Sequence, residues 1–152
     1  MSNDVAASPA APAVGALSKA PRTIGTILAI VGIVLALAGI GTYFTISSTL
    51  AAEKITTSKD ACLPDRAVSG PFTAYCEAMV IAKHAGDATG GKTYAELGKE
   101  DPLRQVAMTA SFLRASLFTS VVAFGVAALT VLLGLLFVLT GVSLRILGTH
   151  KE

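Results

Sequence analysis

The chain has 152 residues, of which 53% are hydrophobic and 14% are charged, and its net charge is +2. Soluble domains carry about 25% charged residues, so this composition favours a membrane protein with one modest domain. The small net charge argues against nucleic-acid binding, and two cysteines with two histidines are too few for a pair of CxxC zinc-binding motifs.

Residues 1–22 are rich in Ala, Ser and Pro and show no apolar period. We expect a disordered cytoplasmic tail there, because so little apolar surface does not compensate the entropy lost on ordering. Lys19 and Arg22 end this tail and come directly before the first apolar run.

Thr23–Ser47 is an uncharged run long enough to cross a bilayer as the first transmembrane helix. It is either an uncleaved signal anchor or a signal peptide cleaved near Thr49–Ala51. The apolar region of a signal peptide usually has about 7–15 residues, so the longer run favours the anchor. Tyr43 and Phe44 fit an interfacial aromatic anchor or ordinary lipid-facing side chains.

Leu117–Leu144 contains no charged residue and predicts the second transmembrane helix. At about 1.5 Å per residue it would span roughly 42 Å, more than the ~30 Å hydrocarbon core. Asp101 as N-cap and Pro102 as first helical residue predict that this helix begins outside the membrane and continues to about Leu147.

The distribution of basic residues predicts the orientation of both helices. The positive-inside rule places both termini in the cytoplasm and residues 48–116 outside a cell membrane. The connecting loop carries eight basic and eight acidic residues, in balance. The basic residues at the far ends of the two runs are Lys19, Arg22, Arg145, His150 and Lys151.

Cys62 and Cys76 would both lie in this exported helical loop. An oxidising compartment favours a disulfide between them, and closing a ring of about 15 residues contributes about 3 kcal/mol in the chain-entropy model. Two unpaired thiols, or pairing with another chain, are the alternatives.

Pro71–Ala85 predicts a short amphipathic helix, because a proline follows Ser69-Gly70 and glycines follow the run. We expect it to pack against another helix or to lie on the membrane. Its apolar positions are Phe72, Tyr75 (or Cys76), Met79 and Ala82, whereas Glu77, Lys83 and His84 fall mostly on the other side. His84 would interact with the helix dipole. Thr93–Gly98 has capping-box spacing and predicts one helical turn.

Gly86–Thr93 reads GDATGGKT and fits the phosphate-binding loop G-x-x-x-x-G-K-[ST]. That loop must follow a β-strand and open a helix, so that backbone amides and the helix dipole meet the phosphates. Here a helical pattern precedes it, so a glycine-rich connector is the better interpretation and we expect no nucleotide binding.

The chain lacks the other common signatures of catalysis and transport. Neither a G-x-S-x-G nor an H-E-x-x-H motif occurs, and the two membrane runs contain no ionisable residue. Intramembrane ionisable groups mark ion paths and proton relays, so a transporter or pump is disfavoured. We therefore predict no catalytic, cofactor-binding or metal site.

Small residues recur at seven-residue steps in both membrane runs and are the candidate helix-packing positions. Such residues allow helices to approach closely in lipid, and a seven-residue period keeps one stripe facing a partner. An antiparallel hairpin with the two stripes together is expected; contact with another protein and chance are the alternatives. The positions are Gly25, Gly32, Gly39, Ser120, Ala127, Gly134 and Gly141.

The stretch GGKTYAEL…DPLRQVAMTASFLRASLFTSVVAFGVAAL resembles a group of small two-helix membrane proteins from actinobacteria, which often carry the name aromatic ring-opening dioxygenase LigA. The resemblance covers about Thr23 to Leu147 and implies a helix–loop–helix architecture in the cell membrane. The dioxygenase name implies iron held by two histidines and a carboxylate. His84 and His150, the two histidines of the chain, are predicted on opposite sides of the membrane.

The sequence thus predicts an all-α membrane protein with two transmembrane helices and a helical extracytoplasmic loop. The expected role is structural or accessory, with the loop presented to a partner in a larger membrane complex. The alternatives are the ring-opening enzyme or a small homo-oligomer in the lipid bilayer.

Overall fold

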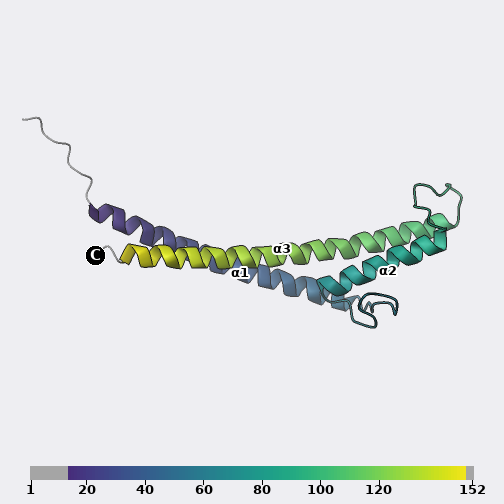
Figure 1. Cartoon of the computed structure of the whole chain (residues 1–152), viewed down its shortest axis with the longest axis horizontal. Helices are drawn as coiled ribbons and strands as arrows, with labels where there is room; N and C mark the ends of the chain where they lie inside the picture. Colours follow the sequence, from purple (N-terminus) through teal and green to yellow (C-terminus); the bar gives the residue numbers. More distant parts are fainter. Residues whose placement is uncertain (1–13, 150–152) are drawn as a thin grey trace, which may run out of the picture. The chain divides into compact units, whose positions relative to one another are not determined.

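The computed structural model describes residues 14–149, and this part of the chain contains three α-helices and no β-strand. Two of the helices are long and apolar enough to cross a membrane, over Ala20–Ala52 and Leu103–Thr149 (Figure 1). The predicted tail residues 1–13, the terminal residues His150 and Lys151, and the side chain of Lys19 lie outside what is described.

Helix α1 comprises Val14–Ala52 and begins nine residues before the predicted start at Thr23. Pro21 lies inside it, where its missing amide hydrogen removes one intrahelical hydrogen bond. The helix ends at Ala52, and two residues later Lys54 has a left-handed φ of 53° and its amide donates to the Ala51 carbonyl at 3.1 Å. The residues Thr49–Ala51 of the alternative cleavage site therefore lie in the last turn of α1.

Helix α2 comprises Pro71–Thr89 and is four residues longer than predicted. At its start, the Gly70 amide donates to the Thr73 hydroxyl at 3.2 Å, which is one half of a capping box. At its end, Gly90 and Gly91 have φ values of 63° and 82°, and the amides of both donate to the Gly86 carbonyl. Gly90 is the left-handed residue of this Schellman-type ending, and glycine also adopts the second positive φ, at Gly91, without a steric penalty.

Helix α3 comprises Leu103–Thr149. The Leu103 amide donates to the Asp101 carboxylate at 2.9 Å, so Asp101 acts as the predicted N-cap. The predicted turn at Thr93–Gly98 forms a hydrogen-bonded turn and not a helix. There the Thr93 amide and hydroxyl both donate to Glu96 at 2.8 Å.

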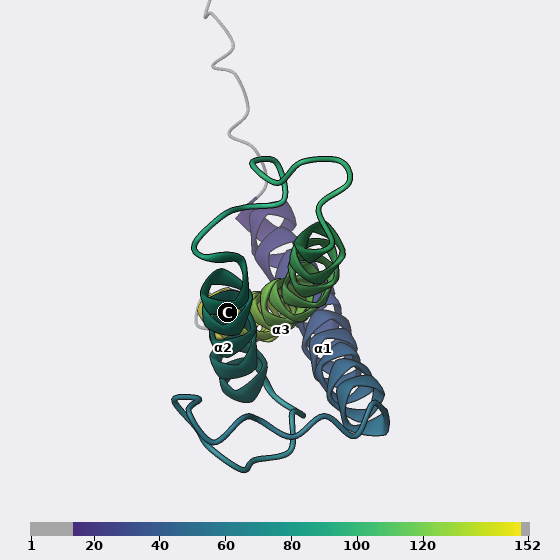
Figure 2. The same cartoon turned by 90° about the vertical axis from the view of Figure 1, so that its right-hand side faces the viewer.

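The chain folds into two compact units. The first combines the chain up to Val34 with the chain from Leu133 onward, and it contains parts of α1 and α3. The second consists of Leu35–Leu132, where α2 runs alongside the first part of α3 in both views of the molecule (Figures 1 and 2).

The core of the second unit lies where α1, α2 and α3 meet. Leu50 of α1, Ala74 and Ala78 of α2, and Leu117 and Phe124 of α3 form one buried cluster with Val68. The small alanines of α2 let this helix approach α3 closely. A satellite cluster of Ala61, Cys76 and Val80 lies under the segment before α2.

Candidate functional site in the loop module

The segment between α1 and α3, residues 53–102, is called the loop module here and belongs wholly to the second unit. Its first part is organised around Thr57, which is buried. The Thr57 amide donates to the Arg66 carbonyl at 2.8 Å, and the Arg66 amide donates to the Thr57 hydroxyl at 2.9 Å. Thr56 and Ala67 form an isolated antiparallel β-bridge, so residues 55–68 make a closed loop.

A disulfide joins this closed loop to α2. Cys62 and Cys76 are bonded with a Cα–Cα distance of 5.4 Å, which lies in the ordinary range for disulfides. The structure thus contains the intramolecular pair that was expected. Cys76 belongs to the satellite cluster with Ala61 and Val80, so this end of the bond packs against apolar side chains, whereas Cys62 is exposed.

Glu77 provides a second link, because it is buried and points at the loop and not at solvent. Its carboxylate accepts hydrogen bonds from the Ser58 amide at 2.9 Å and from the Ser58 hydroxyl at 3.3 Å. The sequence pattern put Glu77 on the polar side of the helix. The closed loop covers that side, so the carboxylate is retained there by hydrogen bonds.

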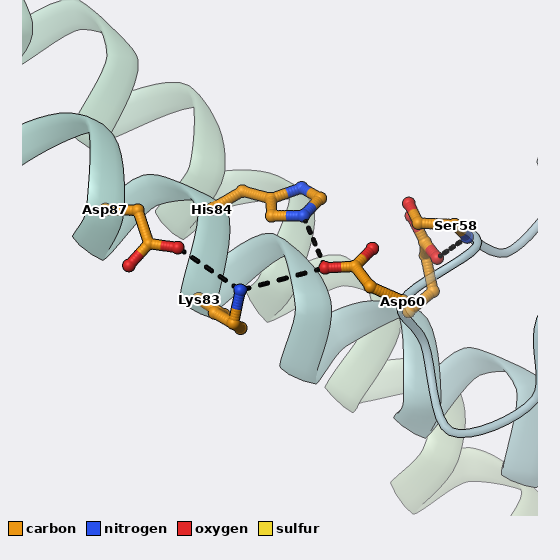
Figure 3. Close-up of polar contacts among 6 residues, drawn as sticks. Ser58, Asp60, Lys83, His84 and Asp87 are labelled. Atoms are coloured by element: carbon orange, nitrogen blue, oxygen red, sulfur yellow. Dashed lines mark hydrogen bonds and ion pairs between the residues drawn. The ribbon is translucent and has the colours of Figure 1, made fainter.

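Asp60 and three side chains of α2 form an exposed ionic cluster (Figure 3). Asp60 Oδ2 lies 2.8 Å from His84 Nε2 and 3.8 Å from Lys83 Nζ, and Lys83 also lies 3.3 Å from Asp87. The hydrogen bond with His84 lowers the pKa of Asp60, and the positive charge of Lys83 adds to this. His84 therefore has Asp60 as its side-chain partner; because α2 continues to Thr89, His84 lies outside the last turn, where the helix dipole was expected to act.

The GDATGGKT stretch forms the end of α2 and the connector after it. The amides of Gly90 and Gly91 donate to Gly86, the amide of Lys92 to Thr89, and that of Thr93 to Glu96. A phosphate loop needs such amides to be free, and it lies at a helix N-terminus. A cavity of about 220 Å³ beside the stretch is lined by both Lys92 and Arg114, but these amides are not available to a phosphate within it.

The far end of the loop module is held by Arg104 of α3. Its guanidinium stacks 4.0 Å above the Tyr94 ring and donates to the Leu97 carbonyl at 2.5 Å. Leu97 is buried. Glu96 accepts two hydrogen bonds from Thr93, and these lower the pKa of Glu96. Arg104 and Glu96 thus both fix the connector between α2 and α3.

The predicted helix-packing glycines of the first unit lie against each other. A Cβ atom added to Gly25 would lie 2.6 Å from the Gly141 carbonyl oxygen, and one added to Gly32 would lie 2.5 Å from that of Gly134. Real Cβ atoms do not approach backbone so closely. At these points only glycine permits the observed distance between α1 and α3.

The second unit contains the other three predicted helix-packing positions, Gly39, Ala127 and Ser120. A Cβ atom added to Gly39 would lie 2.8 Å from the Ala127 carbonyl oxygen, and both residues are buried. Ser120 is half-buried, and its hydroxyl donates to the Ser116 carbonyl of its own helix at 3.2 Å. Gly41, two residues from Gly39, has open space around it.

An apolar groove of about 520 Å³ runs between α2 and α3. Its walls include Ile81, Ala85, Ala88, Val106, Ala110 and Leu113. The predicted apolar face of α2 is different and is turned outward: Phe72, Tyr75 and Met79 are exposed, whereas Ala74 and Ala78 face the core. The helix therefore packs on its alanines, leaves Phe72 and Met79 exposed, and turns one edge of the Tyr75 ring to Phe118 of α3.

The described residues contain no group of three or more His, Cys, Asp or Glu side chains that could hold a metal ion. No family model matches the chain, and no curated protein and no solved structure is significantly similar to it.

Sequence reasoning missed Thr57, Glu77 and Leu97 as buried positions. Each is buried by residues distant in the sequence or by a turn without periodicity, so no local pattern identifies it. Asp60 was also missed as the partner of His84. A carboxylate two residues before Cys62 was the available signal, because the disulfide brings that part of the loop onto α2.

Proposed function

We propose that this chain is an integral protein of the cell membrane that crosses the bilayer twice as an antiparallel hairpin, with both termini in the cytoplasm and residues 48–116 outside. The length and apolar character of α1 and α3 support this topology. The contacts of Gly25 with Gly141, and of Gly32 with Gly134, support the antiparallel direction, because residue numbers rise along one helix and fall along the other.

The positions of two arginines support the orientation. Arg22 of α1 and Arg145 of α3 line one cavity of about 240 Å³ within the first unit. Two basic side chains at the same end of a helix pair are what the positive-inside rule predicts for a cytoplasmic end.

Within this frame the chain acts as a structural or accessory subunit and presents the loop module to a protein partner in a larger membrane complex. The observation that carries this role is that the module has one fixed shape, fastened by the Cys62–Cys76 bond and by buried Glu77, beside an apolar groove. Fixed shape lowers the ordering cost of binding, and an uncovered apolar groove is typical of a docking surface.

The ring-opening enzyme is the alternative with a distinct chemical requirement. Iron in that chemistry is held by two histidines and a carboxylate. His84 is hydrogen-bonded to Asp60, and His150 lies beyond the described residues. Iron analysis of the purified protein separates the two functions: stoichiometric iron that is lost in His84→Ala would favour the enzyme.

Topology is tested first by single-cysteine labelling. In a Cys62→Ala, Cys76→Ala background, Ser8→Cys, Lys99→Cys and Thr149→Cys are each exposed to an impermeant thiol reagent in intact cells. We expect Lys99→Cys alone to be labelled, and all three to be labelled after the membrane is permeabilised. Labelling of both terminal probes with protection of Lys99→Cys would invert the orientation.

The accessory role is tested by crosslinking in native membranes. A photoreactive amino acid replaces Val106, which lines the groove, or Leu139, which is an exposed residue of α3 in the first unit. We expect one adduct of defined mass with another protein at position 106 and none at position 139. Adducts with a second copy of this chain alone would favour the homo-oligomer and contradict the accessory role.

A further inference from the structure

The start of α2 lies level with the end of the first predicted membrane run. The Ser47 hydroxyl donates to the Ser69 carbonyl at 2.7 Å. Ser47 is the last residue of the uncharged run 23–47, and Ser69 comes two residues before α2 begins. This hydrogen bond therefore ties the first turn of α2 to the level at which α1 would leave the hydrocarbon core.

A contact between α2 and α3 independently places the start of α2 at the outer end of the predicted membrane runs. The rings of Tyr75 and Phe118 meet edge to face with their centroids 6.0 Å apart. Phe118 is the second residue of the uncharged run 117–144. The Arg114 guanidinium lies 5.7 Å from the same ring, as expected for a cation at the boundary between lipid and water.

The outward face of this first turn is aromatic. Phe72 is 77% exposed and Tyr75 47% exposed, more than most apolar side chains of the loop module. Phe44, in the membrane run of α1, is 67% exposed and would face lipid. Phe44 and Phe72 are thus both exposed aromatic side chains near the outer end of the first predicted membrane run.

We propose that the first turn of α2 is inserted into the outer interface of the bilayer, with Phe72 among the lipid headgroups and upper acyl chains and Tyr75 beside it. This inference rests on the proposed membrane topology and adds a second, peripheral attachment to it. Aromatic side chains with an apolar body prefer this layer. The bilayer interface itself is the partner that Phe72 contacts.

The inference also predicts how the loop module is oriented relative to the membrane. Tyr94 stacks on Arg104, which lies thirteen residues before Leu117 and so roughly 20 Å farther along α3. One end of the module is therefore attached to the membrane at Phe72, whereas the end near Tyr94 stands in water. The groove between α2 and α3 lies between these two levels.

The chain contains no tryptophan, so single-tryptophan variants report depth without background. Phe44→Trp, Phe72→Trp and Tyr94→Trp are each prepared in the full chain and reconstituted into phosphatidylcholine vesicles with or without brominated acyl chains. The residue type is the same in all three variants, so the intrinsic preference of tryptophan for interfaces is controlled.

We expect Phe72→Trp to show blue-shifted emission and a bromolipid quenching comparable to that of Phe44→Trp, and several times that of Tyr94→Trp. Quenching of Phe44→Trp but not of Phe72→Trp would overturn the interfacial insertion and leave the membrane topology standing. Absence of quenching in both would overturn the topology, and the insertion with it. A shallow bromine position should quench Phe72→Trp more than a deep one.

Discussion

The helix contacts of the first unit and the loop module of the second are stabilised in different ways. In the first unit, α1 and α3 approach at glycines, with no side chain between the backbones at Gly25 and Gly32. In the loop module, a disulfide and hydrogen bonds to buried Glu77 and Thr57 fix segments that contain few large apolar residues. The contrast follows from the surroundings that the proposed topology gives each region.

Within lipid, an apolar side chain gains no hydrophobic free energy when it exchanges lipid contacts for contacts with a partner helix. Close packing of small residues is therefore the main source of attraction between the helices. Within water, a segment such as residues 53–69 would gain from apolar burial but has little to bury: Val68 and Ala61 are its buried apolar residues. Crosslinks and satisfied polar groups then supply the missing stability.

Removing the disulfide should have the largest effect on the loop module. In Cys62→Ala, Cys76→Ala, the closed loop should lose about 3 kcal/mol of stability against local opening, because a ring of about 15 residues is no longer constrained. Hydrogen exchange of peptides from residues 55–69 measures this opening. Unchanged exchange would mean that hydrogen bonds alone fix the loop.

A methyl group at Gly32 should separate the helices of the first unit. Gly32→Ala brings a carbon to 2.5 Å from the Gly134 oxygen and 2.7 Å from the Val138 amide nitrogen, so we expect destabilisation of about 1–3 kcal/mol by overpacking. Thermal unfolding in detergent measures it. Gly41→Ala is the matched control in the same helix, with open space around its Cβ; equal effects of the two variants would refute the close contact.

Removing the Glu77 carboxylate should loosen the closed loop without touching the disulfide. Glu77→Ala leaves the Ser58 amide without its acceptor at a partly buried position, which costs about 1–3 kcal/mol. Ser58→Ala keeps that amide bond and removes only the longer hydroxyl contact, so its effect on hydrogen exchange should be smaller. The reverse order would show that the hydroxyl is the important donor.

The sequence predicted the helices well because their signals are local. Uncharged length identified the apolar parts of α1 and α3, Asp101-Pro102 identified the start of α3, and the glycines expected after the α2 run include Gly90-Gly91, at which α2 ends. The extension of α1 back to Val14 was not predicted, because Pro21 and the Ala-rich composition there gave no helical period.

The loop was predicted less well because its contacts join residues far apart in the chain. The Cys62–Cys76 pair could be anticipated because the loop offers two cysteines. The partners of Glu77 and His84 lie 19 and 24 residues earlier, and no periodicity links them. The apolar period of α2 also predicted the wrong packing face, since Phe72 and Met79 are exposed whereas Ala74 and Ala78 pack in the core.

A substitution at Lys54, just after the end of α1, should stabilise the chain. Lys54 has a left-handed φ of 53°, a conformation that glycine adopts without the cost of about 1–2 kcal/mol that a side chain brings. Lys54→Gly should therefore raise the thermal midpoint slightly, whereas Glu53→Gly should not. A lower midpoint for Lys54→Gly would mean that the lysine side chain contributes contacts that outweigh the backbone strain.

The weakest link between the closed loop and α2 should be the exposed Asp60–His84 pair. The pKa of Asp60 in the folded chain is lowered below its ordinary value of 3.8, so the pair contributes stability above that value and loses it as the pH falls through the lowered pKa. Asp60→Asn should therefore open residues 58–62 more than wild type near neutral pH, and the difference should vanish in strong acid. Both side chains are exposed, so added salt should reduce the difference between Asp60→Asn and wild type.

Asp87→Asn, which removes only the contact with Lys83 within α2, should leave hydrogen exchange of the loop unchanged. A difference between Asp60→Asn and wild type that persisted at every pH would mean that the lost interaction is a hydrogen bond to the neutral acid and not an ion pair.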